Sequence, residues 1–266
     1  MMRKKTTLMF WITGLCMQLI LGNGNPVVAQ SLQFGAKGGF SVPRLSGGDT
    51  EQSQGFKSRF APAFGLIAHR TLSSHFGVQV EVLYVGQGGK RDEMQPVPAE
   101  NLTGLPLPPG VSLYADFKNE AILNYMEIPV LARYRLPVSS SLDAYLAAGP
   151  YMGVLLNAKT VTSGMSQLFL DGAGRAPVVD AQGNPLPPMN FDDERSITSD
   201  IKKYNFGAAA GIGLALHTSS GLMFVDVRGT TGFTHIQRDE RNGKNNTGAL
   251  VITAGFLYNL RGRGAR

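Results

Sequence analysis

The chain has 266 residues, a formal net charge of +6 and a single cysteine, Cys16. One cysteine excludes an internal disulfide, so stability must come from hydrogen bonding and packing. Three of the excess positive charges, Arg3, Lys4 and Lys5, lie in a segment that we expect to be removed, so the charge falls to +3 and does not indicate nucleic-acid binding.

Residues 1–29 have the pattern of a secretory signal peptide. A basic start precedes an apolar stretch over residues 8–21, and Val27 and Ala29 supply the small residues of a cleavage site. The apolar stretch is too short to span a membrane comfortably as a helix. Cys16 lies inside that stretch rather than after it, which disfavours a lipoprotein. We therefore expect export, and a single domain over residues 30–266.

Eight strands are predicted in this domain. In most of them apolar residues occupy every second position, while Gly, Ala or charged residues lie between. The fifth strand is apolar on both faces at its middle, so periodicity leaves its facing open. The predicted strands are 33–41, 59–69, 76–86, 122–136, 142–158, 204–216, 223–233 and 250–260.

The connections between these strands alternate between long and short. Short turns are expected at residues 71–74, 137–141 and 218–221, and long loops at about 42–57, 88–119, 159–199 and 238–246. Such alternation is typical of a membrane β-barrel, which has short turns on one side and long loops on the other. With an even strand count and an exported chain, we expect periplasmic turns and extracellular loops.

The apolar face of the strands fits lipid better than a buried core. The opposite face is rich in Gly and Ala, which suits a narrow lumen, and Tyr84, Tyr134, Tyr204 and Tyr258 lie on the apolar face where an aromatic girdle is expected. The alternative is a secreted soluble barrel or sandwich, whose apolar face would point inward. We predict an all-β protein, an eight-stranded antiparallel transmembrane up-and-down β-barrel, in contact with outer-membrane lipid and lipopolysaccharide.

Five charged residues fall on the predicted inward face. In a barrel of eight strands, side chains fill the interior. Unpaired buried charges are costly, so we expect these residues to form ion pairs in a structural lumen network, with an ion pathway as the alternative. They are Glu81, Glu127, Arg133, Asp226 and Arg228.

Five segments resemble the PorT-type outer-membrane β-barrel proteins. The segments are FGAKGGFSVPRLSG (34–47), YMEIPVLARYRL (125–136), AAGPYMGVLLNAK (147–159), KKYNFGAAAGIGLAL (202–216) and DVRGTTGFTHI (226–236). The resemblance covers nearly the whole exported chain apart from the long loops. It implies an eight-stranded outer-membrane barrel, and one branch of that family assists a protein secretion system. Such barrels tend to end on an aromatic residue, whereas this chain continues past Phe256 and Tyr258 into NLRGRGAR.

The third long loop contains a short repeat. Asp171 and Gly174 recur as Asp180 and Gly183, and Asp-x-x-Gly suits a tight turn in which Asp caps the backbone and Gly adopts positive φ. We predict two turns that project from the barrel. A calcium loop would need more carboxylates at alternate positions. The acidic run 192–194 is interpreted as a solvated face rather than a metal cluster.

One histidine at the predicted loop side has acidic neighbours. His235 precedes Asp239 and Glu240, a weak form of the pattern seen in barrel enzymes that carry out chemistry at the rim. The glycines of GAAAGIG (207–213) have the wrong spacing for a phosphate-binding loop and lie within a strand. We interpret the remaining histidines, His69, His75 and His217, as interfacial residues at the ends of strands. We predict no catalytic, cofactor-binding or metal-binding residues.

The sequence therefore predicts a non-enzymatic integral outer-membrane protein. We expect a surface-binding or structural, anchoring barrel of PorT type, whose long loops bind an extracellular ligand. The alternatives are an accessory component of protein secretion, with secretion-system proteins as partners, a narrow channel for small solutes, and a hydrolase or acyltransferase acting at the rim.

Overall fold

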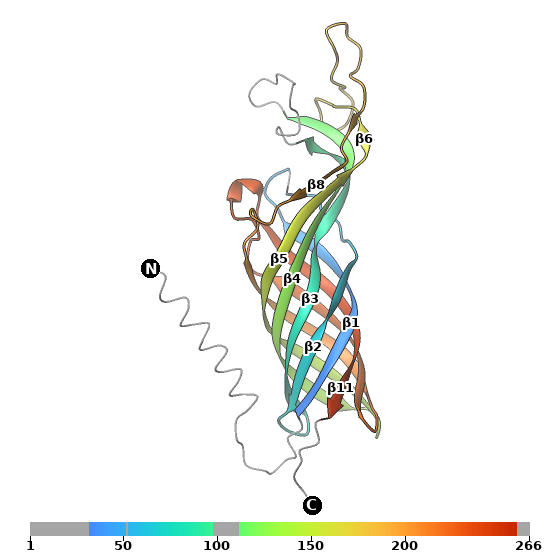
Figure 1. The fold of residues 1–266 in the computed structure, drawn as a ribbon, viewed down its shortest axis with the longest axis vertical. Helices are drawn as coiled ribbons and strands as arrows, with labels where there is room; N and C mark the ends of the chain where they lie inside the picture. Colours follow the sequence, from blue (N-terminus) through green and yellow to red (C-terminus); the bar gives the residue numbers. More distant parts are fainter. Residues whose placement is uncertain (1–31, 52, 98–111, 260–266) are drawn as a thin grey trace, which may run out of the picture.

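The computed structural model describes residues 32–51, 53–97 and 112–259 (Figure 1). The predicted signal peptide with Cys16, most of the Pro-rich part of the second long loop and the C-terminal NLRGRGAR from residue 260 onward lie outside these residues. The predictions made for them stay predictions. In the described part of the chain, no helix has the length and apolarity needed to cross a membrane.

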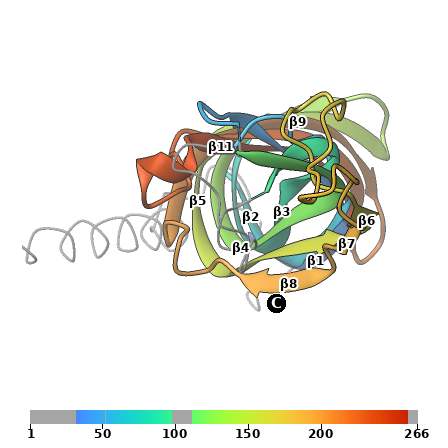
Figure 2. The same ribbon diagram turned by 90° about the horizontal axis from the view of Figure 1, so that it is seen from above.

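Eight antiparallel strands close into a barrel, which Figure 2 shows from above. Around the ring the order is β4, β3, β2, β1, β11, β10, β9 and β5, and β5 pairs with β4 to close it. The ring strands are β1 (Leu32–Gly47), β2 (Ala61–Thr71), β3 (Phe76–Val97), β4 (Leu113–Pro137), β5 (Leu142–Ser163), β9 (Tyr204–His217), β10 (Gly221–Gly232) and β11 (Asn245–Asn259). The predicted up-and-down topology is confirmed.

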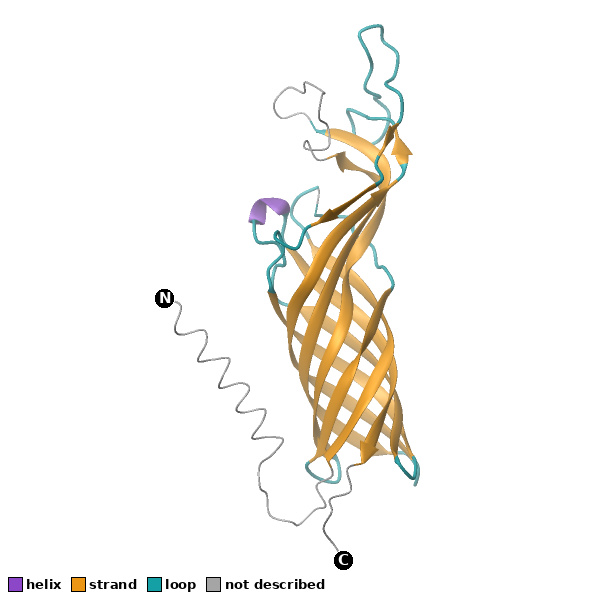
Figure 3. Cartoon of the chain, viewed as in Figure 1, coloured by secondary structure: helices purple, strands orange, loops and turns teal. Residues whose placement is uncertain are grey.

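Short turns lie at one end of the barrel and long connections at the other (Figure 3). We call these the turn end and the loop end. The turn end carries residues 72–75, 138–141 and 218–220, together with the start of β1 and the end of β11. The loop end carries a short 3-10 helix, η2 (Glu240–Asn242), and the small strands β6 (Met165–Ser166), β7 (Met189–Asn190) and β8 (Asp193–Ser196).

Five of the ring strands are longer than predicted by four residues or more: β1, β3, β4, β5 and β11. β3, β4 and β5 rise above the rest of the barrel (Figure 1), with pairs running up to Val97–Leu113 and Lys118–Ser163. β8 then pairs with the upper part of β5. The loops expected at 88–119 and 159–199 are therefore shorter than predicted. The loops expected at 42–57 and 238–246 are shorter too, because strand pairing there continues to Gly47 and Asn245. The strands are longer because backbone hydrogen bonds between neighbours continue into segments whose sequence no longer alternates between apolar and polar residues.

The apolar faces of the strands point away from the barrel. Phe64 on β2 is 53% exposed and Ile212 on β9 is 61% exposed, whereas Gln79 and Glu81 on β3 are each 1% exposed. A soluble protein would have the reverse arrangement, because exposed apolar surface of this extent is unfavourable in water. The soluble barrel or sandwich is therefore excluded, and the predicted transmembrane barrel is confirmed.

The structure shows which side chains of β5 point into the barrel. Asp143, Tyr145 and Tyr151 point inward and are buried. Their rings need space on the neighbouring strand β9, which supplies glycine: a Cβ on Gly213 would lie 2.3 Å from Tyr145 Cζ, and one on Gly207 would lie 2.5 Å from Tyr151 Cε1. The glycines that the sequence placed on the lumen face thus make room for two tyrosines of β5.

The four tyrosines expected in a girdle all lie on the outer face. Tyr134 packs against Phe76 at the turn end, with ring centroids 4.9 Å apart, and Tyr258 lies near the turn-end terminus of β11. Tyr84 stacks on Phe64 at 5.0 Å, and Tyr204 begins β9 at the loop end. Aromatic side chains at both ends of the apolar band are typical of membrane barrels.

Candidate functional site

Four charged side chains form a compact cluster across the middle of the lumen. Lys37 of β1 and Arg228 of β10 surround Glu81 of β3, with Asp226 of β10 beside them. Arg228 donates from both Nη atoms to the two Glu81 oxygens at 2.9 Å, and Lys37 Nζ lies 3.0 Å from Glu81 Oε2. Each of these side chains is at most 4% exposed. Two cations thus balance two anions inside the barrel.

Neutral polar residues complete this cluster. Thr253 of β11 donates to Asp226 Oδ1 at 3.1 Å, and Gln79 donates to Glu81 Oε1. Asp226 Oδ2 lies 3.5 Å from Lys37 Nζ and 3.7 Å from Arg228 Nη2. A buried ion pair is tolerated when further hydrogen bonds satisfy its charges, as they do here for most of these atoms.

The structure brings together three of the five predicted lumen residues, Glu81, Asp226 and Arg228. Among the residues that the structure describes, the other two form no ion pair, so that part of the prediction is wrong. Glu127 accepts a hydrogen bond from Gln87 Nε2 at 2.9 Å, and Arg133 donates to Gln79 Oε1 at 3.2 Å. Strand register is the reason: Glu127 pairs with Leu83, towards the loop end from Glu81, and Arg133 pairs with Gly77, towards the turn end.

Sequence reasoning missed Lys37, the second cation of the cluster. The signal was present in β1, where Gln33, Gly35, Gly39 and Ser41 share the face of Lys37. That face has the small and polar composition used to identify the lumen side of the other strands. Applied to β1, the same period of two would have placed Lys37 inside.

Little free space accompanies the charges in the middle of the lumen. Beside Glu127, between Tyr151 and Arg228, the structure contains a cavity of only about 10 Å³. That is no more than a single water molecule requires. Side chains therefore fill this level of the barrel, as expected for eight strands.

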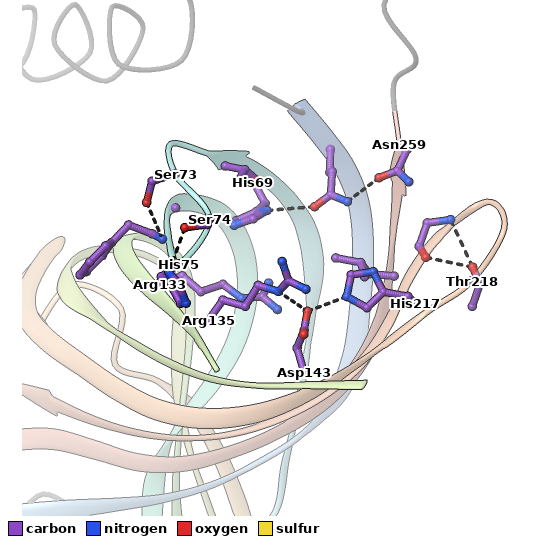
Figure 4. A pocket seen from close by; sticks show the side chains of 16 residues that line it. His69, Ser73, Ser74, His75, Arg133, Arg135, Asp143, His217, Thr218 and Asn259 are labelled. Carbon is purple, nitrogen blue, oxygen red and sulfur yellow. Dashed lines mark hydrogen bonds and ion pairs between the residues drawn. The ribbon is translucent and has the colours of Figure 1, made fainter. Parts of the chain in front are cut away.

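A larger cavity opens at the turn end (Figure 4). It has a volume of about 310 Å³. Asp143 Oδ2 lies 2.5 Å from Arg135 Nε and 2.6 Å from His217 Nε2. The three histidines interpreted as separate interfacial residues all line this cavity, because the barrel brings the starts and ends of different strands together. The titratable lining residues are His69, His75, Arg133, Arg135, Asp143 and His217.

The loop end has a small apolar core of its own. Side chains from the raised parts of β3 and β4 pack with Leu168 and Phe191 of the connection that follows β5. The rings of Phe117 and Phe191 stack with centroids 4.8 Å apart. We call the raised strands and this connection the crown. Its core comprises Val97, Leu113, Ala115, Phe117, Leu168 and Phe191, with Val178 and Met189 packed against it.

The two predicted turns of the crown are confirmed. Asp171 accepts hydrogen bonds from the backbone N–H groups of Arg175 and Ala176, and Asp180 accepts from those of Gln182 and Asn184. Gly174 and Gly183 have φ values of 68° and 82°. Backbone hydrogen bonds, from Arg175 to Asp171 and from Asn184 to Asp180, lower the pKa of both carboxyls.

The rim histidine does not join the acids that follow it. His235 Nδ1 lies 2.7 Å from Asn246 Oδ1. Asp239 pairs with Arg241 at 2.7 Å, and Glu240 pairs with Lys244 at 3.0 Å. In the acidic run 192–194, Asp192 accepts from the Gly164 N–H and Glu194 pairs with Lys159. Within the described ranges, no three His, Cys, Asp or Glu residues are grouped as metal ligands.

Comparison with solved structures finds similar chains at low sequence identity. Ail, the attachment invasion locus protein of Yersinia pestis, solved with the heparin analogue sucrose octasulfate, is 13% identical with a TM-score of 0.37, over 86% of this chain and 99% of Ail. Neisserial surface protein A is 11% identical with a TM-score of 0.38, over 85% and 96%. OprG of Pseudomonas aeruginosa is 11% identical with a TM-score of 0.37, over 87% and 98%.

Sequence comparison gives the family. No curated protein matches the chain significantly. The sequence profile described as the outer membrane protein beta-barrel domain matches residues 28–238, which is well over half of the chain. The matched region includes seven of the eight ring strands, from β1 to β10. The chain therefore belongs to the family of proteins with an outer membrane protein beta-barrel domain.

Proposed function

We propose that this protein is a non-enzymatic, surface-binding barrel of PorT type that holds a rigid crown outside the cell. The observation that carries the proposal is the crown itself. β3, β4 and β5 continue as paired strands above the rim, and their apolar core fixes the connection between β5 and β9. A connection held in one shape by a scaffold is a suitable binding surface, since little conformational entropy is lost when a ligand binds.

The exposed surface of the crown favours a protein as the ligand. Met165 and Leu170 are 70% and 55% exposed, and Val179 is 50% exposed. Paired charges also lie in the crown, for example Arg175 with Asp171, which follows Leu170 in the chain, and Lys159 with Glu194. Apolar side chains within a polar surround are the usual composition of a protein-binding surface.

The proposal requires the crown to face outward, and cysteine labelling tests this. Removal of the predicted signal peptide leaves a chain without cysteine. We expect Gln182→Cys, in a crown turn, to react with a membrane-impermeant maleimide on intact cells. The matched control Ser140→Cys, in a turn-end loop, should react only after the outer membrane is opened. Labelling of Ser140→Cys alone on intact cells would reverse the orientation and remove the basis for surface binding.

The proposal also predicts that the barrel does not conduct ions steadily. The lumen cluster of Lys37, Glu81, Asp226 and Arg228 closes the middle of the barrel. In planar-bilayer recordings of purified protein we expect no stable conductance step, with an open porin as the positive control. Steady, reproducible steps would favour the alternative of a narrow solute channel.

A further inference from the structure

The proposed function uses the crown and leaves the turn-end cavity unassigned. This cavity has a volume of about 310 Å³ and is open at the turn end of the barrel. Its size lies at the lower end of the range for small-molecule sites. It is built from several strands at once, with His69 on β2, Arg133 on β4 and Asp143 on β5, so its shape depends on the closed barrel.

The charges that line the cavity are mostly cationic. Two guanidinium groups, those of Arg133 and Arg135, line the cavity with a single carboxylate, that of Asp143, and three imidazoles complete the polar lining. Asp143 Oδ2 is already engaged by Arg135 Nε and His217 Nε2, at 2.5 and 2.6 Å. Among the described residues, Asp143 Oδ1 has no hydrogen-bond partner, but the carboxylate forms no ion pair with the other cationic group, Arg133.

Arg133 is a buried cation that has no carboxylate partner in the part of the chain that the structure describes. The residue is 6% exposed, and its guanidinium lies over the Tyr145 ring at 3.6 Å. Nη1 donates to Gln79 at 3.2 Å, but among the described residues no carboxylate forms an ion pair with it. Within the described part of the chain, Nε and Nη2 make no hydrogen bond, and neither is among the buried polar atoms that lack both a partner and contact with solvent. Their open side is the cavity that Arg133 lines.

We propose that the turn-end cavity binds an oxyanion group, a carboxylate or a phosphate, on the guanidinium of Arg133. A buried charge is costly unless it is paired, and an anion in the cavity would supply the missing partner. Free guanidinium N–H groups match the paired oxygens of carboxylate and phosphate. Arg135 lines the same cavity and adds positive charge around the bound group.

Titration of the refolded barrel in detergent micelles tests the proposal. Inorganic phosphate and N-acetylglutamate are added separately at constant ionic strength, because screening changes with salt. We expect saturable shifts in the amide resonances of Gly77 and Gly221, which line the cavity. Gly174 and Gly183 in the crown should not move. Saturation by phosphate alone or by N-acetylglutamate alone identifies the group, and absence of saturation with both overturns the proposal.

Substitutions connect the binding to Arg133. Arg133→Gln is expected to weaken binding by at least about tenfold. The matched control is Arg241→Gln, which makes the same charge change at the loop end, where Arg241 is exposed and paired with Asp239. Heat-modifiable gel mobility shows whether each variant is folded. If Arg133→Gln does not fold, Arg133→Lys replaces it, and weaker binding is still expected because an ammonium lacks the planar fork. Wild-type affinity in the folded Arg133 variant would overturn the proposal.

Discussion

Glu81→Gln is expected to lower the free energy of unfolding by about 3–5 kcal/mol, the range for breaking a buried ion pair by removing one partner. The Glu81 carboxylate accepts two hydrogen bonds from Arg228 at 2.9 Å and lies 3.0 Å from Lys37. Without it, two buried cations face Asp226 alone. Because the cluster joins β1, β3 and β10, its loss weakens the barrel across the lumen rather than along one hairpin.

Denaturant unfolding of the barrel in lipid vesicles measures this effect. The matched control is Glu93→Gln, where Glu93 pairs with Lys57 at 3.1 Å but its side chain is 38% exposed. Glu93→Gln should lower the free energy of unfolding by less than about 1 kcal/mol, as expected for a surface ion pair. Adding Lys37→Met to Glu81→Gln restores the charge balance and should recover part of the stability. Equal losses for Glu81→Gln and Glu93→Gln would contradict a buried, balanced cluster.

Gly213→Val is expected to destabilise the barrel by about 3 kcal/mol, at the upper end of the usual cost of overpacking. A Cβ on Gly213 would lie 2.3 Å from Tyr145 Cζ and 2.6 Å from the Val225 carbonyl oxygen. The ring of Tyr145 cannot move away freely, because the Arg133 guanidinium covers it at 3.6 Å. The variant should lose much of its folded, heat-modifiable form on gels.

A second glycine provides the control for this experiment. Gly229 lies on the outer face of β10, where the nearest atom to an added Cβ is the Ala210 carbonyl oxygen at 3.9 Å. Gly229→Val should therefore fold as the wild type does. Combining Gly213→Val with Tyr145→Ala should restore part of the stability, because the ring is then absent. Failure of Gly229→Val to fold would indicate a general intolerance of strand glycines to substitution rather than a packed lumen.

Local patterns in the sequence were enough for the strands and two of the turns. A period of two separates the faces of any strand, so Tyr84 could be assigned to the apolar outer face and Glu81 to the inward face before strand pairing was known. The crown turns were equally local, because Asp171 and Asp180 bond backbone groups a few residues ahead. The sequence also predicted that short turns and long loops alternate. β3, β4 and β5 are longer than their pattern of apolar residues suggested.

By itself, then, the sequence determined the fold class and which face of most strands meets lipid. Only the tertiary structure decided which inward residues meet. It placed Lys37 beside Glu81, kept Glu127 and Arg133 apart from that pair, and gathered histidines from separate strand ends around one cavity. The physical reason is that periodicity fixes the face on which a side chain lies but not its height in the barrel. Height depends on strand register and shear, which are set when all eight strands close.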